Sequence, residues 1–306
     1  MTEITFRQAL QRGLREALDA DPDVFLMGED IGKYDGAYAV TQGLLEKYGP
    51  DRVRDTPISE AAFVGAGVGA AVAGLRPVVE LMSMSFSLVA SDQIVNMAAK
   101  IRYMSGGQLK VPMVLRAPTG GGVQLAATHS QSFENWYASV PGLKVVTPST
   151  PYDALGLLRS SIEDDNPVVF AENALLYATR GDVPDEEYRV PIGVADVKRT
   201  GTDITLVGWA HGIVTLMAAA EKLAETGVSA EVVDLRSLRP LDMETVIESV
   251  EKTGRALVLD ENWRTAGFGA ELAAEIGYRS SDYLDGPVAR VSGTDTPSPY
   301  SRPLEQ

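Results

Sequence analysis

The sequence contains no cysteine, which excludes structural disulfides, thiolate catalysis and thiolate metal ligands. Histidine is almost as scarce, with 2 residues among 306, so each histidine is a candidate for a specific task. Basic residues are in the minority, because 27 Lys and Arg stand against 42 Asp and Glu, a net charge of −15. We therefore expect no nucleic acid ligand, since binding to phosphates needs clustered Lys and Arg.

A long apolar run of the kind that crosses a membrane is also missing, because Arg76, Pro77 and Glu80 interrupt the longest uncharged stretch. The first residues, Met1 to Phe6, show no basic, apolar or small-residue signal pattern. We expect a soluble protein without a membrane partner, located in the cytoplasm of a bacterium. If a transit peptide was removed, the mitochondrial matrix or a plastid fits equally well.

Short β-branched runs alternate with longer helical patterns, an order typical of βαβ units and a mostly parallel sheet. The predicted strands are Val24–Met27, Pro77–Leu81, Pro112–Leu115, Lys144–Val146 and Pro167–Phe170. The predicted helices are near residues 5–19, 41–48, 60–75, 88–104 and 151–163. With 306 residues, 45% of them apolar, the chain is long enough for two domains with substantial cores.

The composition changes between Thr179 and Gly201, where charged residues, Gly and Pro replace large apolar residues. We interpret this stretch as an interdomain linker with one edge strand, and we divide the chain into domains 1–185 and 186–306. Further strands are predicted at Ile204–Val207, Glu231–Asp234, Ala256–Asp260 and Val288–Val291, and helices at 212–225, 242–252 and 267–278. The second domain is therefore expected to be a smaller α/β unit.

Glu60 is a lone carboxylate directly before an uncharged run of small and apolar residues, Ala61 to Gly74. An acid at the edge of an apolar, close-packed segment is costly unless something pairs with it, which makes Glu60 a candidate for a shifted pKa and for catalysis. The alternative is an ordinary first-turn acid that complements the helix dipole. Position alone leaves both interpretations open.

The predicted helix after Glu60 carries rows of small residues at i, i+4 spacing. Glycines in a helix interior cost roughly 0.5–1 kcal/mol each relative to alanine, so a close neighbour is expected to offset them. A tightly packed internal helix and a helix at a subunit interface fit equally well. A dinucleotide-binding fingerprint does not fit, because Gly65, Gly67 and Gly69 lack the required spacing and no strong strand is predicted to end before Pro57.

Several other segments are candidates for a ligand site at the carboxyl ends of strands. The glycine loop Thr119–Gly122 follows a predicted strand and leads to His129, which a proton-carrying role and a structural role explain equally well. Phe86 follows another strand and is either a stacking platform for a planar ligand or part of the core. His211 is expected to be structural, and residues 161–167 to cap a turn or to present oxygen atoms to a hard cation.

These segments together resemble one family over essentially the whole chain: the beta subunits of the decarboxylating first component of 2-oxo acid dehydrogenase complexes. The family includes pyruvate, branched-chain 2-oxo acid and acetoin dehydrogenases. The motifs that carry the resemblance are Gly28-Glu29-Asp30, Asp55-Thr56-Pro57-Ile58-Ser59-Glu60, Ser91-Asp92-Gln93-Ile94, Arg102-Tyr103-Met104-Ser105-Gly106-Gly107, His129-Ser130-Gln131-Ser132, Pro141-Gly142-Leu143-Lys144-Val145-Val146, Asp165-Asn166-Pro167, Asp234-Leu235-Arg236-Ser237-Leu238-Arg239-Pro240-Leu241-Asp242 and Thr296-Pro297-Ser298-Pro299-Tyr300. The resemblance implies a transketolase-like α/β fold, in which a pyrimidine-binding domain with a parallel sheet between helices is followed by a smaller α/β C-terminal domain.

The resemblance also implies the cofactor thiamine diphosphate and roles for five residues. Glu60 matches the glutamate that bonds the aminopyrimidine ring nitrogen and favours the imino tautomer, which lets the cofactor generate its own carbanion. Glu29 and the backbone carbonyl of Ile58 match further cofactor-binding positions, and Phe86 matches the aromatic residue that stacks on the pyrimidine. His129 matches the active-site histidine of proton transfer or reductive acyl transfer to lipoyl.

A metal site and a second subunit follow from the same resemblance. Residues Met113, Ser161, Ile162, Asp164 and Asn166 match a structural potassium site built largely from carbonyl groups. The chain contains no Gly-Asp-Gly motif, with which thiamine enzymes hold the diphosphate through Mg²⁺, so an alpha subunit must supply that half of the site. The expected assembly is an alpha2beta2 heterotetramer.

The expected function is that of a beta subunit that acts with the alpha subunit to decarboxylate a small 2-oxo acid of the pyruvate class and to pass the acyl group to a lipoylated dihydrolipoyl acyltransferase. The alternatives are a branched-chain or acetoin dehydrogenase subunit, a carboligase or transketolase-type half enzyme that uses no lipoyl group, and a scaffold without activity. Ala126 and Ala127 depart from the family pattern, which has a glycine in the loop before His129.

Overall fold

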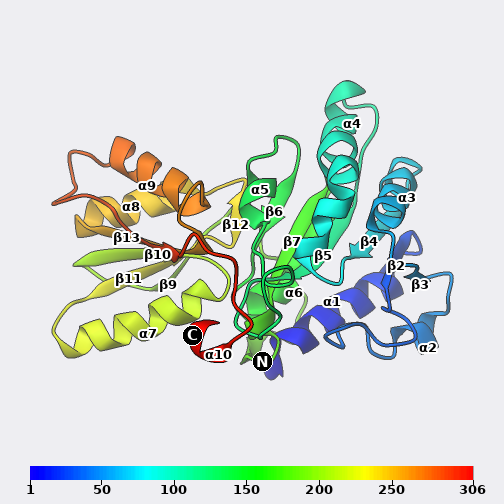
Figure 1. The fold of residues 1–306 in the computed structure, drawn as a ribbon, viewed down its shortest axis with the longest axis horizontal. Coiled ribbons are helices and arrows are strands. Elements are labelled where there is room, and N and C mark those ends of the chain that lie inside the picture. Colours follow the sequence, from blue (N-terminus) through cyan, green and yellow to red (C-terminus); the bar gives the residue numbers. More distant parts are fainter. Residues whose placement is uncertain (306) are drawn as a thin grey trace.

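The structure is a computed structural model that describes residues 1–305. Two α/β units lie side by side, the first built around a large sheet and the second around a smaller one (Figure 1). The first unit contains the N-terminal helices and the second contains the helices that follow residue 211. This arrangement confirms the predicted α/β class with a second, smaller unit.

The large sheet has seven strands. In spatial order they are β12 (Ser237–Arg239), β6 (Lys144–Val146), β7 (Val168–Asn173), β5 (Val114–Thr119), β4 (Arg76–Glu80), β2 (Val24–Glu29) and β3 (Val53–Thr56). All neighbouring pairs from β6 to β3 are parallel, as the alternation predicted. Only β12, which comes from the second half of the chain, is antiparallel, and it pairs with β6. The carboxyl ends of the six parallel strands, β6 to β3 in spatial order, therefore share one edge, where ligands bind in open parallel sheets.

Helices cover both faces of the large sheet. They are α1 (Phe6–Ala20), α2 (Leu44–Tyr48), α3 (Glu60–Val72), α4 (Ala99–Met104), α5 (Glu134–Ala138) and α6 (Pro151–Glu163), with the shorter turns η1 (Met84–Ala90), η2 (Gln93–Ala98) and η3 (Ala174–Leu176). Helix α1 packs along α6, and Gly13 makes this possible because a Cβ there would lie 3.0 Å from Leu158 Cδ2. Thr5 and Gln8 form a capping box that starts α1.

The smaller sheet has five strands, in the order β14 (Ala289–Gly293), β13 (Ala256–Trp263), β10 (Ile204–Gly208), β11 (Ala230–Asp234) and β9 (Asp196–Arg199). Helices α7 (Gly212–Glu225), α8 (Met243–Thr253) and α9 (Phe268–Arg279) flank it, with α7 on the face opposite α8 and α9 (Figure 1). The last helix, α10 (Arg302–Glu305), returns to the first unit, where Glu305 contacts Gly122.

The stretch Thr179–Gly201 contains more structure than the single edge strand that the sequence predicted. Strand β8 (Arg180–Val183) forms a separate antiparallel pair with β1 (Thr2–Thr5), and β9 forms the edge of the smaller sheet. The pattern of β8 and β9 is weak because both strands are short and partly exposed, so tertiary pairing decides their conformation.

Two other predictions were wrong in detail. The segment 88–104 is not one α-helix: η1 is a 3₁₀ turn, η2 is π-helical, and α4 completes the segment. A strand does precede Pro57, because Val53–Thr56 forms the edge strand β3. Its charged residues hid it, since edge strands tolerate exposed polar side chains. The glycines of α3 still lie inside a helix rather than in a strand–helix turn, so the fingerprint is absent.

Helix α3 has one tightly packed face and one open face. Gly67 faces β4, where a Cβ would lie only 2.6 Å from Val79 Cγ2. On the other side, Ala62, Ala66 and Gly69 are exposed, and a Cβ on Gly69 would meet nothing within 4 Å. Among residues 1–305, no helix has both the length and the apolar character needed to cross a membrane.

Candidate active site

Glu60 is the first residue of α3 and is only 5% exposed. Strand β3 ends at Thr56, Pro57 stops the pairing, and Ser59 takes the N-cap position without a side-chain cap bond. The Glu60 carboxylate therefore lies at the positive end of the helix dipole, which favours its negative charge. Glu60 is therefore a first-turn acid, as one interpretation expected, and it is also buried; its catalytic role stays a prediction.

Glu29 lies beside Glu60 because β2 and β3 run in parallel with Glu29 opposite Thr56. Glu29 is also 5% exposed, and its Oε1 atom has no hydrogen-bond partner within the described residues. Burial, together with the negative charges of Glu60 and Asp30, raises the pKa of Glu29 to about 7. We call Glu29 and Glu60 the carboxylate pair. A buried acid without a partner at a sheet edge is typical of a ligand site.

Phe86 and His129 meet in space although 43 positions separate them in the sequence. Their ring centroids are 5.1 Å apart, and the planes of the two rings are nearly perpendicular, at 88°. Phe86 belongs to η1, which packs against α3, so the ring pair lies near the helix that begins with Glu60. Thr128 Oγ1 lies 2.9 Å from His129 Nδ1, and His129 is exposed. The Nε2 atom of His129 is thus directed by Thr128 and remains free for a ligand.

Ile58 is in the connection between β3 and α3, and its side chain is 82% exposed. A large apolar side chain that is so exposed to solvent, next to a buried acid, is typical of a surface that a ligand or another chain covers. Ile58 lies near Glu60 because only Ser59 separates the two residues in the chain.

The expected potassium-site residues, Met113, Ser161, Ile162, Asp164 and Asn166, lie where α6 ends and β7 begins, beside the start of β5. Arg76 donates hydrogen bonds to the carbonyl oxygens of Ile162 (2.9 Å) and Asp164 (3.3 Å), and Lys144 pairs with the Asp164 carboxylate. Cationic side chains therefore already contact part of this oxygen cluster. Within residues 1–305, no group of three or more His, Asp or Glu side chains is arranged to hold a metal.

Glu134, the first residue of α5, is a buried acid that the sequence did not predict. It is 4% exposed and accepts a hydrogen bond from Thr119 Oγ1 at 3.0 Å. Burial raises the pKa of Glu134 to about 7, with smaller contributions from Asp260 and Glu261. The only signal in the sequence is its position just after His129–Ser132, which does not reveal burial.

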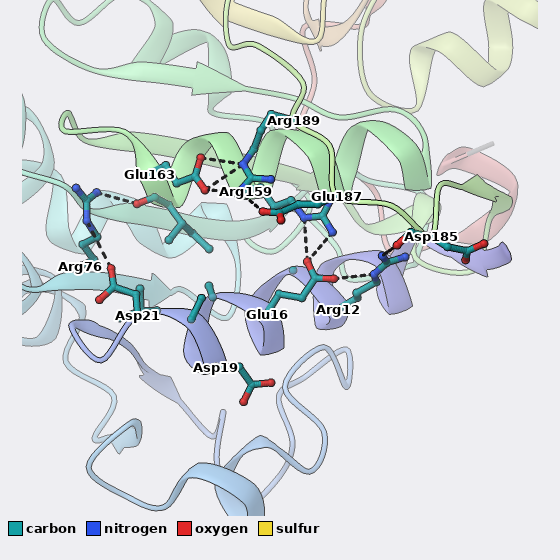
Figure 2. Close-up of a pocket in the computed structure, with 15 residues that line it drawn as sticks. Arg12, Glu16, Asp19, Asp21, Arg76, Arg159, Glu163, Asp185, Glu187 and Arg189 are labelled. Carbon is teal, nitrogen blue, oxygen red and sulfur yellow. Dashed lines mark hydrogen bonds and ion pairs between the residues drawn. The ribbon is translucent and has the colours of Figure 1, made fainter. Parts of the chain in front are cut away.

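A hollow of about 630 Å³ lies between α1 and α6 (Figure 2), and neither member of the carboxylate pair lines it. Its charged side chains pair with one another: Glu16 binds both Arg12 and Arg159, and Arg189 binds Glu163. Because these charged side chains pair with one another, we assign no ligand to the hollow.

Comparisons with known proteins match both units. Residues 2–179 match the family described as "Transketolase, pyrimidine binding domain", and residues 193–306 match "Transketolase, C-terminal domain". A solved structure described as "Split gene transketolase, inactive beta4 tetramer" has the same fold, with a TM-score of 0.77 and 24% identity over 96% of this chain and 90% of its own. The chain is thus a transketolase-type protein with these two domains.

Closer relatives are more specific. The chain is 51% identical to "Pyruvate dehydrogenase E1 component subunit beta-1, mitochondrial" of Arabidopsis thaliana, over 99% of this chain and 85% of that protein. It is 48% identical to "Pyruvate dehydrogenase E1 component subunit beta" of Rickettsia bellii, over 99% of this chain and 94% of that protein. The chain belongs to the family of pyruvate dehydrogenase E1 component beta subunits.

Proposed function

We propose that this chain is the beta subunit of a thiamine diphosphate-dependent pyruvate dehydrogenase, which acts with an alpha subunit to decarboxylate pyruvate and pass the acyl group to lipoyl on an acyltransferase. The observation that carries the proposal is the carboxylate pair, in which Glu29 Oε1 has no partner among the described residues. Two buried acids without a cation fit a ligand that brings hydrogen-bond donors and positive charge.

Thiamine diphosphate, when bound, supplies a carbon nucleophile for the 2-oxo group. Glu60 holds the proton at the ring nitrogen of the aminopyrimidine, a task for which its place at the start of α3 suits an ionised carboxylate. Glu29, with a pKa of about 7, stores a proton beside Glu60 near neutral pH. The pair therefore keeps one negative charge where two would repel.

Three other residues complete this half of the site. Phe86 offers a ring face to the pyrimidine, and the exposed Ile58 offers its backbone carbonyl to the exocyclic amine. His129, directed by Thr128, transfers a proton or stabilises the acyl group during its transfer to lipoyl. The alpha subunit holds the diphosphate through Mg²⁺, because this chain has no Gly-Asp-Gly sequence.

The surface around α3 supports the assembly with an alpha subunit as an alpha2beta2 heterotetramer. Large apolar side chains are exposed on the connection before α3, on η1 and η2, which contact α3, and on α4: Ile58, Val89, Met97, Tyr103 and Met104. The open face of α3 carries Ala62, Ala66 and Gly69, whose small side chains let another backbone approach closely. Extended apolar exposure of this kind is typical of a protein interface.

We also propose a structural K⁺ at the end of α6. The carbonyl groups of Met113, Ser161 and Ile162 and the oxygens of Asp164 and Asn166 are the hard ligands that such a cation takes. Arg76 shares the Ile162 carbonyl, since a carbonyl oxygen has two lone pairs. Replacing K⁺ by Na⁺ in the buffer should lower the melting temperature of the complex, measured by calorimetry, and an unchanged value would contradict this site.

Replacement of Glu60 tests the catalytic proposal. Glu60→Gln keeps the size of the side chain but removes the charge, and we expect kcat of the reconstituted alpha–beta complex to fall by about 10²–10⁴-fold. Glu271→Gln is the matched control, because Glu271 is also a first-turn acid but is exposed on α9. Full turnover of the Glu60 variant, with unchanged folding by circular dichroism, would reject the catalytic assignment.

The assembly has its own test. Ala66→Arg puts a long cation on the open face of α3, and we expect it to prevent alpha2beta2 formation in size-exclusion chromatography with light scattering. Ala274→Arg, on the exposed surface of α9, should leave assembly intact. A normal heterotetramer with Ala66→Arg would show that this face is not the interface.

Substrate choice rests on the names of the relatives. Initial rates of the co-expressed complex with pyruvate, 2-oxoisovalerate and acetoin should favour pyruvate, whereas a preference for either of the others would identify a different dehydrogenase. Activity without any lipoyl acceptor, in the form of carboligation, would favour the alternative of a transketolase-type half enzyme.

A further inference from the structure

A hollow of about 810 Å³ separates the end of β5 from the second unit. Gly122, Ser130, His211, Asn262, Trp263 and Glu305 are among the residues that line it. We call this hollow the interdomain cavity. None of these residues belongs to the proposed cofactor site, yet Ser130 directly follows His129 in the chain.

A carboxylate already occupies one wall of the interdomain cavity. The side chain of Glu305 accepts hydrogen bonds from two backbone groups of the glycine loop, Gly122 N–H at 2.9 Å and Gln124 N–H at 3.0 Å. Gly120, Gly122 and Gln124 have positive φ angles of 89°, 93° and 59°. Loops of this conformation direct successive N–H groups to one point and bind anions there.

Two polar groups on the cavity wall lack a partner. Ser130 is 6% exposed and Asn262 is 4% exposed, and neither Ser130 Oγ nor Asn262 Nδ2 forms a hydrogen bond within residues 1–305. Ser130 and Glu305 lie on either side of Gly121 in the cavity wall, since a Cβ on Gly121 would be 3.7 Å from both Ser130 Cβ and Glu305 Oε1. Buried polar groups in proteins are nearly always bonded, so these two require a ligand or water.

The cavity also contains a histidine that tends to be positive. His211 Nδ1 lies 2.9 Å from Glu261 Oε1, and this contact raises the pKa of His211. The second oxygen of Glu261 accepts a hydrogen bond from Asn173 Nδ2 at 2.8 Å, so the Glu261 charge is already engaged. His211 Nε2 forms no bond to the described residues and is a donor when the ring is protonated.

We propose that the interdomain cavity is a binding site for a small oxyanion, a carboxylate or a phosphate monoester, and that Glu305 is an intramolecular surrogate that the ligand displaces. The N–H groups of Gly122 and Gln124, which now bind Glu305, and the ring of His211 supply donors to the oxyanion. Ser130 and Asn262 line the cavity and bind the rest of the ligand. Occupation of the site acts on the loop that carries His129, because Ser130 contributes to both.

Fluorescence titration of the protein tests the site, with Trp263 as the reporter on the cavity wall and a Trp263→Phe variant to identify its signal. A tethered carboxylate competes at an effective concentration on the order of millimolar, so Glu305→Gln should bind the added anion about tenfold more tightly than the wild type. Glu248→Gln is the matched control, an exposed acid on α8 with the same change of charge. Acetate and inorganic phosphate are titrated separately, and the tighter of the two identifies the oxyanion class.

Equal affinity in the wild type and in Glu305→Gln would overturn the site, and so would an equal gain in the Glu248 control, which would indicate a general charge effect. The location is tested in the Glu305→Gln background. Adding Ser130→Ala or His211→Gln should weaken anion binding at least about threefold, as expected for the loss of a hydrogen bond to a charged group. Unchanged affinity in both double variants would place the anion elsewhere.

Discussion

Two groups of buried carboxylates lie at the large sheet and differ in whether a cation pairs with them. In the first, Arg116 on β5 contacts Glu172 through two hydrogen bonds of 2.7 Å each and also pairs with Glu80. Tyr177 donates a further bond of 2.7 Å to Glu172. In the second, Glu29 and Glu60 have no cation, and Glu29 Oε1 has no hydrogen-bond partner within the described residues.

The presence of a cation in one group and its absence in the other indicates different roles: the Arg116 group stabilises the sheet, and the carboxylate pair is a candidate ligand site. The Arg116 group ties β4, β5 and β7 together and satisfies its own charges, so it needs nothing from outside. The carboxylate pair beside the same sheet has no cation and leaves Glu29 Oε1 without a partner among the described residues, an arrangement that is typical of ligand sites. Burial alone identifies neither group, whereas the presence or absence of partners does.

The largest effect is expected when the satisfied group is broken. Arg116→Met removes the cation and leaves Glu80 and Glu172 buried without compensation, which should destabilise the protein by about 3–5 kcal/mol in urea unfolding at pH 7. Arg189→Met removes an exposed ion pair and should cost at most about 1 kcal/mol. A loss below about 1 kcal/mol in the Arg116 variant would erase the distinction between the two groups.

A substitution in the carboxylate pair should raise the stability of the protein, whereas Arg116→Met lowers it. The folded-state pKa of Glu29, about 7, lies above its unfolded value, so the protein loses stability as pH rises from about 4.5 to 7. Glu29→Gln should therefore stabilise the protein at pH 8, by about 2 kcal/mol relative to its effect at pH 4. Parallel stability curves of wild type and variant across this range would contradict the raised pKa.

A smaller loss of stability is expected when only the Tyr177 hydrogen bond of the Arg116 group is removed. Tyr177→Phe deletes the hydroxyl that bonds Glu172 and keeps the ring against Tyr38, at 4.8 Å between centroids. We expect a loss of about 1.5 kcal/mol in the free energy of unfolding, since the hydrogen bond is to a charged group. Tyr283→Phe, at an exposed position, is the control and should be neutral.

The smallest effect is the coupling within the carboxylate pair. In a cycle of Glu29→Gln, Glu60→Gln and the double variant, the relief of repulsion is gained only once, so the stabilities should deviate from additivity by about 1 kcal/mol at pH 8. At pH 4, well below the pKa of about 7 of Glu29, that acid is protonated and the deviation should be much smaller. Strict additivity at both values would mean that the two acids do not interact.

The periodic elements were predictable from the sequence because their patterns are local. Helices at 151–163 and 212–225 and the strand Lys144–Val146 have the predicted bounds. The π-helical turns of η2 were not predictable, since an apolar spacing of three to four residues also fits a regular helix. Strands β1, β8 and β12 were missed because each pairs with a segment far away in the sequence.

Only the part of the candidate site that depends on local sequence was predictable. Glu60 stands out in the sequence because it is an isolated charge before an uncharged run, and its burial follows. Its proximity to Glu29 depends on the register of β2 and β3, and β3 was not predicted. The Arg116 group was invisible for the same reason, since its partners are 36 and 56 positions away and meet only when three strands are aligned.

Strand β12 has a consequence for how this protein can be divided. It comes from the C-terminal unit but completes the sheet of the N-terminal unit by pairing with β6. A fragment that stops at residue 185 would leave β6 as an open strand, a template for aggregation. The two units therefore have to be expressed, exchanged between relatives and engineered as one piece.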